Sequence, residues 1–125
     1  MDIMEKIKRK HARKHKVEFQ QLYQLGQINV KIENYDKARM YFQKAMNVVK
    51  IRYGVEHTYV LEVRENLADI HVIEDNISAA ISIYRSLLST LEKKYGDNHD
   101  RYLTVLQKLA EIDTDQMERR STYGY

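Results

Sequence analysis

Two histidines near the N-terminus, His11 and His15, have the spacing of a metal-binding pair on a helix. Residues four apart lie on one side of an α-helix, so their imidazoles could bind the same ion. The flanking residues are lysine and arginine, which repel a cation, and no carboxylate or cysteine stands nearby as a third ligand. We therefore expect no metal site and no cofactor.

The few residues that could carry catalysis have no visible partners. His71 has neither a base nor a nucleophile beside it, and His57 and His99 recur at equivalent loop positions, which indicates a structural role. The sequence also lacks a glycine-rich phosphate loop and a pair of carboxylates beside a recognisable pocket. It predicts a non-enzymatic protein.

Positive charge is concentrated in the segment KRKHARKHK, residues 8–16. Residues 1–20 contain seven Lys or Arg and three Asp or Glu, a net charge of +4 against +3 for the whole chain. Such a segment could bind the phosphates of a nucleic acid or an acidic protein surface, or act as a nuclear-import signal. A solvated helical extension explains it more simply, and no aromatic residue interleaves with the charges to stack on bases. The candidate polyanion-binding residues are Lys8, Arg9, Lys10, Arg13, Lys14 and Lys16.

The C-terminal residues 117–125, MERRSTYGY, show no apolar periodicity, so we expect a flexible tail. Arg119-Arg120-Ser121-Thr122 could be a site for a basic-directed kinase, and Tyr123-Gly124-Tyr125 could instead pack on a neighbour.

The composition, 43% hydrophobic and 31% charged over 125 residues, is typical of one soluble domain. The absence of cysteine excludes disulfides and thiol chemistry and fits a reducing compartment. No apolar run is long enough for a membrane span or a signal core. We expect a cytoplasmic protein, with a nuclear location also open.

The sequence repeats itself at a fixed interval of 42 residues. Such a period is typical of stacked repeats, because one repeat cannot bury its apolar face alone. A step backward from the second copy also reaches Leu25-Gly26. The pairs are Tyr53-Gly54 with Tyr95-Gly96, His57 with His99, and Leu67-Ala68 with Leu109-Ala110.

The spacing of apolar residues and the absence of proline predict helices throughout, with no sheet. The predicted ranges are 22–31, with an extension back toward Ile3, then 35–52, 59–73, 77–95 and 101–116. Asn34, Thr58 and Asp100 are the predicted N-caps, and Gly54 and Gly96 the predicted left-handed ends. The predicted buried stripes are Ala38, Tyr41, Phe42, Ala45, Met46 and Val49; Leu61, Leu67, Ala68 and Ile70; Ala80, Ile81, Tyr84, Leu87, Leu88 and Leu91; and Leu103, Leu106, Leu109 and Ala110.

Small residues stand where two helices of one hairpin would cross, at Gly26 and Ala38, with Phe42 beside the crossing. Together with Leu22, Leu25 and Ala45, their spacing resembles the tetratricopeptide repeat. The longer 42-residue step, the Tyr-Gly-x-x-His motif and Asn66-Leu67-Ala68 resemble the repeats of kinesin light chain and nephrocystin-like proteins. Thr58 and Asp100 stand where that family usually has proline.

The resemblance implies a concave groove, lined by the first helix of each repeat, that holds a peptide. Glu62, Glu65 and Asp69 would make its middle acidic, and Asn66 resembles the asparagine with which the family holds a ligand backbone. We expect a ligand with Lys or Arg near its centre, unlike the acidic-flanked peptides of kinesin light chain. A solvated acidic face is the alternative. The candidate groove residues are Gln20, Tyr23, Gln27, Glu62, Glu65, Asn66, Asp69, Thr104, Gln107 and Glu111.

The expected fold is all-α: a right-handed superhelix of antiparallel hairpins, about two tetratricopeptide repeats closed by a capping helix with Gln107, Lys108, Glu111 and Asp115 on its wet side. The expected parts are a basic extension (residues 1–18), the repeat domain (19–116) and the tail (117–125). The expected function is a protein-binding adaptor that could also self-associate through its open helix ends. A basic arm that binds nucleic acid or an acidic surface, and a structural subunit of a larger complex, are the alternatives.

Overall fold

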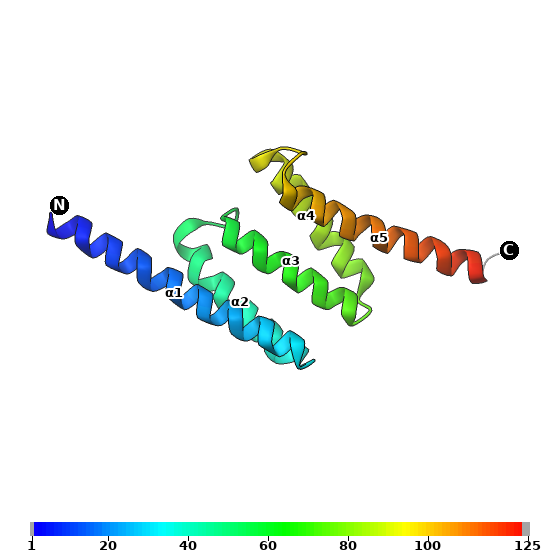
Figure 1. The fold of residues 1–125 in the computed structure, drawn as a ribbon, viewed down its shortest axis with the longest axis horizontal. Helices are drawn as coiled ribbons and strands as arrows, with labels where there is room; N and C mark the ends of the chain where they lie inside the picture. The colour runs from blue at the N-terminus through cyan, green and yellow to red at the C-terminus, as the bar shows by residue number, and fades with distance from the viewer. Residues whose placement is uncertain (1, 124–125) are drawn as a thin grey trace. The chain divides into compact units, whose positions relative to one another are not determined.

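A computed structural model describes residues 2–123 of the chain, with side chains up to Arg119. These residues form five helices and no strand, which confirms the all-α prediction. The helices are α1 (Ile3–Lys31), α2 (Tyr35–Tyr53), α3 (Thr58–Ile73), α4 (Ile77–Tyr95) and α5 (Asp100–Tyr123) (Figure 1).

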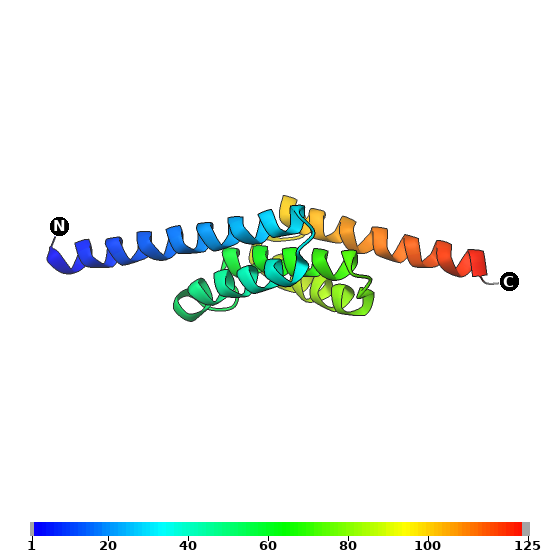
Figure 2. The same cartoon turned by 90° about the horizontal axis from the view of Figure 1, so that it is seen from below.

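The first helix is a single rod of 29 residues that includes the basic segment. The Asp2 side chain caps it by accepting the Glu5 N–H at 2.8 Å. No proline or glycine interrupts the helix before Gly26, so the predicted extension toward Ile3 is helical. Figure 2 shows the N-terminal part of α1 extending past the end of α2.

An asparagine or histidine side chain caps α2, α3 and α5, whereas Asn76 before α4 makes no capping hydrogen bond with its side chain. Asn34 caps α2 as predicted, by accepting the Lys37 N–H at 3.3 Å. The predicted caps Thr58 and Asp100 are wrong, because both residues are already helical. The residue before each provides the cap instead. The Nδ1 atoms of His57 and His99 accept the N–H groups of Tyr59 and Arg101, both at 3.1 Å.

Two glycines end α2 and α4. Gly54 has φ 89° and ψ 172°, and Gly96 has φ 86° and ψ 168°. The positive φ agrees with the prediction, but ψ is extended rather than left-handed helical. This region of backbone space is open almost only to glycine. The extended ψ carries the chain away from the helix and into the loop.

The last helix continues further than predicted. We expected it to end near Gln116, whereas α5 continues to Tyr123. The predicted tail is therefore helical over residues 117–123, while Gly124 and Tyr125 lie outside the described residues. Met, Glu and Arg are good helix formers, and no glycine or proline stops the helix before residue 124.

The helices group into two compact units, and the division falls within α3, between Asn66 and Leu67. In the first unit α1 packs along α2, and in the second α4 packs along α5. The short connection of residues 32–34 makes α1 and α2 a hairpin, as predicted, and the equally short connection of residues 74–76 joins α3 to α4.

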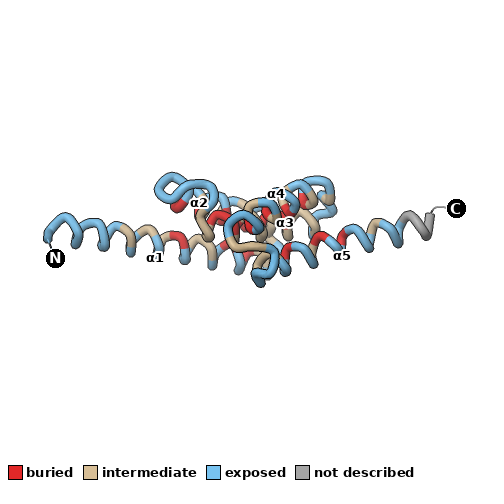
Figure 3. Tube along the Cα trace, turned by 90° about the horizontal axis from the view of Figure 1, so that it is seen from above, coloured by how far each residue is buried: buried red, intermediate tan, exposed pale blue. Residues whose placement is uncertain are grey.

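The core of the first unit is built around Phe42, whose side chain is fully buried together with Ala38, Ala45 and Val49. A Cβ atom on Gly26 would come within 2.5 Å of the Phe42 ring, so only glycine fits there. Two other predicted core residues of α2, Tyr41 and Met46, are only half-buried. Figure 3 shows buried residues in red.

On α3 all four predicted core residues are buried, whereas on α4 the predicted core residues Ile81 and Leu88 are only half-buried. Val60 and Val63 of α3 are also buried, which the sequence analysis missed.

The predicted buried stripe of α5 is mostly wrong. Leu103 and Leu106 are 46% and 41% exposed, and Ala110 is exposed as well. No helix among the described residues covers this face of α5 as α2 covers the equivalent face of α1. The residues of α5 that are buried are Val105, Leu109 and Ile112.

Candidate functional site

In the first unit, a hydrogen bond links two of the predicted groove residues. The Asn66 Nδ2 atom donates to the Tyr23 hydroxyl at 2.8 Å and to the Glu62 carbonyl at 2.9 Å. An amide nitrogen has two hydrogens, so both are used within the unit. A ligand carbonyl could accept from this nitrogen only by displacing the Tyr23 hydroxyl or the Glu62 carbonyl.

The other predicted groove residues of this unit differ in exposure. Gln20 and Gln27 are exposed on α1, whereas Glu62 and Glu65 are half-buried on α3. Between the two glutamates lies Arg64, whose guanidinium has a pKa lowered by burial. A basic side chain therefore shares the segment that the sequence analysis treated as purely acidic.

In the second unit, Asp69 is held by two partners. Its carboxylate accepts a hydrogen bond from the Tyr84 hydroxyl. The carboxylate also forms an ion pair with Lys108, whose Nζ atom lies 3.1 and 3.0 Å from the two oxygens. Lys108 was predicted on the wet side of α5, but it is half-buried. The positive charge of Lys108 offsets the negative charge of Asp69, so any net negative charge at this site must come from other residues.

A cavity of about 450 Å³ lies around this ion pair, between α3, α4 and α5. Two exposed carboxylates, Glu111 and Asp115, stand on α5 at its wall, and Glu111 accepts a hydrogen bond from Gln107 at 3.2 Å. Thr104 is turned toward its own helix, where it donates to the Asp100 carbonyl at 2.9 Å. The cavity thus combines three carboxylates and one lysine with an apolar wall. Its lining residues are Asp69, Val72, Ile73, Tyr84, Lys108, Glu111, Ile112 and Asp115.

Two features of this cavity were not predicted from the sequence. Asp115 had been assigned only to the wet side of α5, and Lys108 had no basic counterpart one step earlier, where Asn66 stands. A comparison of positions 42 residues apart identifies only those residue types that occur in both copies of the repeat.

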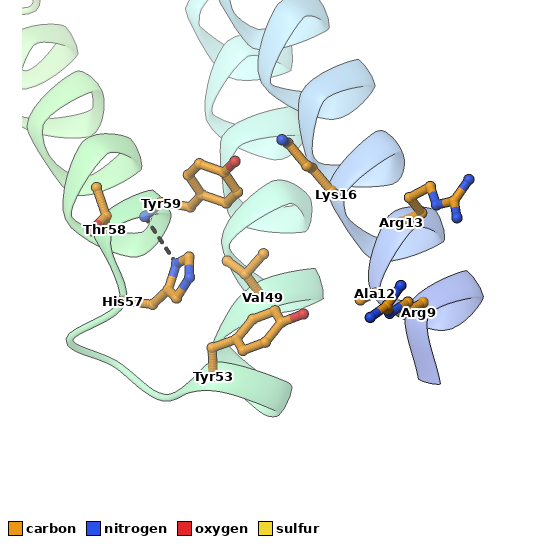
Figure 4. A pocket seen from close by; sticks show the side chains of 9 residues that line it. All are labelled: Arg9, Ala12, Arg13, Lys16, Val49, Tyr53, His57, Thr58 and Tyr59. Atoms are coloured by element: carbon orange, nitrogen blue, oxygen red, sulfur yellow. Dashed lines mark hydrogen bonds between the residues drawn. The ribbon is translucent and has the colours of Figure 1, made fainter. Parts of the chain in front are cut away.

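A second cavity, of about 560 Å³, lies in the first unit beside the basic segment. Arg9, Ala12, Arg13 and Lys16 of α1 form one wall of it (Figure 4). Three of the six candidate polyanion-binding residues therefore share a face, whereas Lys8, Lys10 and Lys14 do not line the cavity. The opposite wall consists of Val49, Tyr53, His57, Thr58 and Tyr59.

These elements match a known repeat. The family model of the tetratricopeptide repeat matches residues 18–93, more than half of the chain. The chain belongs to the tetratricopeptide repeat family. No curated protein and no solved structure gave a match.

The matched residues extend from the middle of α1 to near the end of α4. The four helices α1 to α4 are thus the two helix pairs of two tetratricopeptide repeats, with α5 after them. Domains of this family generally mediate protein–protein interaction and are typically non-catalytic. The Tyr-Gly-x-x-His motif of these repeats has a structural explanation. His57 stacks on Tyr53 with ring centroids 4.9 Å apart, and His99 on Tyr95 at 4.4 Å, while each histidine caps the following helix.

The remaining histidines lie apart from these motifs. His11 is exposed, and His15 lines a smaller cavity with Glu18, a carboxylate that the sequence analysis had not counted. The Nδ1 atoms of His15 and His71 are buried without a hydrogen-bond partner. Within the described part of the chain there is no group of three side chains that could hold a metal ion. Nor is any helix of residues 2–123 both long and apolar enough to cross a membrane.

Proposed function

We propose that this tetratricopeptide repeat protein is a non-enzymatic adaptor that binds a segment of a partner protein against the first helices of its repeats. Family membership supports protein binding in general. Gln20 and Gln27 of α1 and Glu111 of α5 are exposed, whereas the polar residues of α3 are half-buried, so the support is strongest for α1 and α5.

The ligand that we propose carries a lysine or arginine beside an aliphatic residue. The cavity between α3, α4 and α5 carries this proposal, because it joins three carboxylates and one lysine to an apolar wall. An exposed ion pair contributes at most about 1 kcal/mol. Burial of an aliphatic side chain of the ligand adds about 1.5–3 kcal/mol, so the two contacts together are needed for useful affinity.

The 42-residue step resembles kinesin light chain, but the charge of this cavity differs from the basic groove of that family. We therefore propose that the chain binds a different class of peptide. Glu111 and Asp115 are the residues on which this difference depends, since Asp69 is already paired with Lys108.

The test is a selection from a displayed library of random peptides. We expect the wild-type chain to select sequences in which Lys or Arg stands next to an aliphatic residue. The variant Glu111→Lys with Asp115→Lys should select no such sequences. The control Glu92→Lys with Asp97→Lys makes the same change of charge at exposed positions away from the cavity, and it should select as wild type does. Equal behaviour of the two variants would contradict the proposal.

Self-association is a further part of this proposal. Leu103, Leu106, Ala110 and Met117 are all exposed and follow each other at intervals of three, four and seven residues, so that they share one face of α5. Two copies of such a stripe can cover each other.

A further inference from the structure

We propose that the cavity beside the basic segment is a binding site for a phosphate monoester carried by a protein segment. Its cationic wall is formed by α1, and its apolar and aromatic wall by the end of α2 and the start of α3 (Figure 4). The site lies in the first unit and uses none of the residues on which the proposed peptide contacts of α5 depend. Either proposal can therefore fail alone.

The three cations are positioned by the helix. Arg9, Arg13 and Lys16 are spaced at i, i+4 and i+7, which places them on one side of α1 over roughly 10 Å. In Figure 4, Lys16 extends from α1 toward Tyr59, while the Arg13 guanidinium is turned outward at the rim. Long side chains at a rim can close over a ligand that enters.

These cations have no acidic partner in the described part of the chain. Other basic residues do: Lys108 pairs with Asp69, Arg39 with Asp36, and Arg119 with Asp75. No carboxylate is found among the described residues that line the cavity. A wall of unpaired cations attracts a compact anion of high charge. A phosphate monoester carries a charge of about −1.5 to −2 and three strong acceptor oxygens, which arginine can bind in pairs.

The opposite wall would contact the side chain that carries the phosphate. Val49 is buried at the base, and Tyr53 provides an exposed ring. The aromatic rings already stack on one another: Tyr59 lies against Phe19 with centroids 4.3 Å apart, and Tyr53 against His57. Rings used in this way offer little area for successive bases, so the geometry favours a side chain with a phosphate over a nucleic acid.

The test is a titration with phenyl phosphate, followed by the backbone amide signals in two-dimensional NMR. We expect saturable shifts at Ala12, Val49, Tyr53 and Thr58. Phenol, which has the same ring without the charge, should cause none of them. If phenol gives the same shifts, or if phenyl phosphate gives none, the proposal is wrong.

Two double variants show whether the site itself or the general charge of α1 is responsible. Arg9→Gln with Arg13→Gln removes two cations from the cavity, and we expect binding about tenfold weaker or more. Lys8→Gln with Lys10→Gln removes two cations from other faces of the same helix and should leave the affinity within about twofold. Equal weakening in both variants would show diffuse attraction and overturn the proposal. Single-stranded DNA that binds more tightly than phenyl phosphate and loses affinity equally in both variants would also overturn it, in favour of a nucleic-acid arm.

Discussion

Gly26 on α1 and Ala110 on α5 occupy the same position in the repeat, two 42-residue steps apart, but their surroundings differ. Gly26 is buried under the Phe42 ring, whereas Ala110 is exposed. A second pair of equivalent residues shows the same contrast. Leu103 lies seven residues before Ala110 on α5 and is exposed, whereas its equivalent on α3, Leu61, is buried. A repeated sequence thus identifies equivalent positions, but burial depends on the helix that covers them.

The largest expected effect tests this contrast directly. Leu61→Ala should lower the free energy of unfolding by about 2–5 kcal/mol, because it leaves a cavity in a packed core. Leu103→Ala removes the same atoms from an exposed surface and should cost no more than about 1 kcal/mol. Urea unfolding followed by circular dichroism measures both. Similar losses would mean that α5 is covered in solution.

A substitution at Gly26, where α1 approaches the Phe42 ring closely, should have the second-largest effect on the free energy of unfolding. Gly26→Ala gains about 1 kcal/mol of helix propensity, but its Cβ would overlap the buried Phe42 ring, at a cost of about 1–3 kcal/mol. We therefore expect a net loss in the wild-type background. In a Phe42→Leu background the same substitution should be less costly, which a double-mutant cycle of unfolding free energies detects. Additive effects would contradict the contact.

The exposed face of α5 provides the third test. Leu103→Lys with Leu106→Lys should convert a self-associating chain into a monomer, as measured by sedimentation at micromolar concentration. The control Ile28→Lys with Ile32→Lys changes two exposed apolar residues at the C-terminal end of α1 and should leave the association unchanged. A wild-type chain that sediments as a monomer would rule out self-association.

The smallest expected effect concerns the two histidine caps. His57→Ala and His99→Ala should each cost about 1 kcal/mol of unfolding free energy, since each removes the acceptor of one N–H group in the first turn of a helix. His57 also contacts Tyr59 edge-on with centroids 5.0 Å apart, whereas Arg101 stands at the equivalent position after His99. We therefore expect the larger loss at His57. Equal melting temperatures for wild type and both variants would contradict the capping role.

Much of the fold followed from the sequence because local signals are strong. Glycine after an apolar stripe predicted the ends of α2 and α4, and Asn34 predicted the start of α2. The caps of α3 and α5 were missed because histidine is an uncommon cap, and its role depends on a ring held in place by a tyrosine four residues earlier. The end of α5 was missed because a lack of apolar periodicity does not stop a helix.

The candidate site was less predictable, because its charges are set by contacts between helices. Asp69 looked like a free carboxylate in the sequence, and only the packing of α5 shows that Lys108 pairs with it. The aromatic residues that face Arg9 and Lys16 come from α2 and α3, more than thirty residues away in the sequence. No local sequence pattern predicts contact between segments this far apart in the chain.

The continuity of α1 has a mechanical consequence. A helix of 29 residues without an internal break is roughly 43 Å long, and its N-terminal half turns as one body with the half that holds Gly26 and Phe19. A force applied to the basic end of α1 would therefore be transmitted along the helix to its contact with the Phe42 ring.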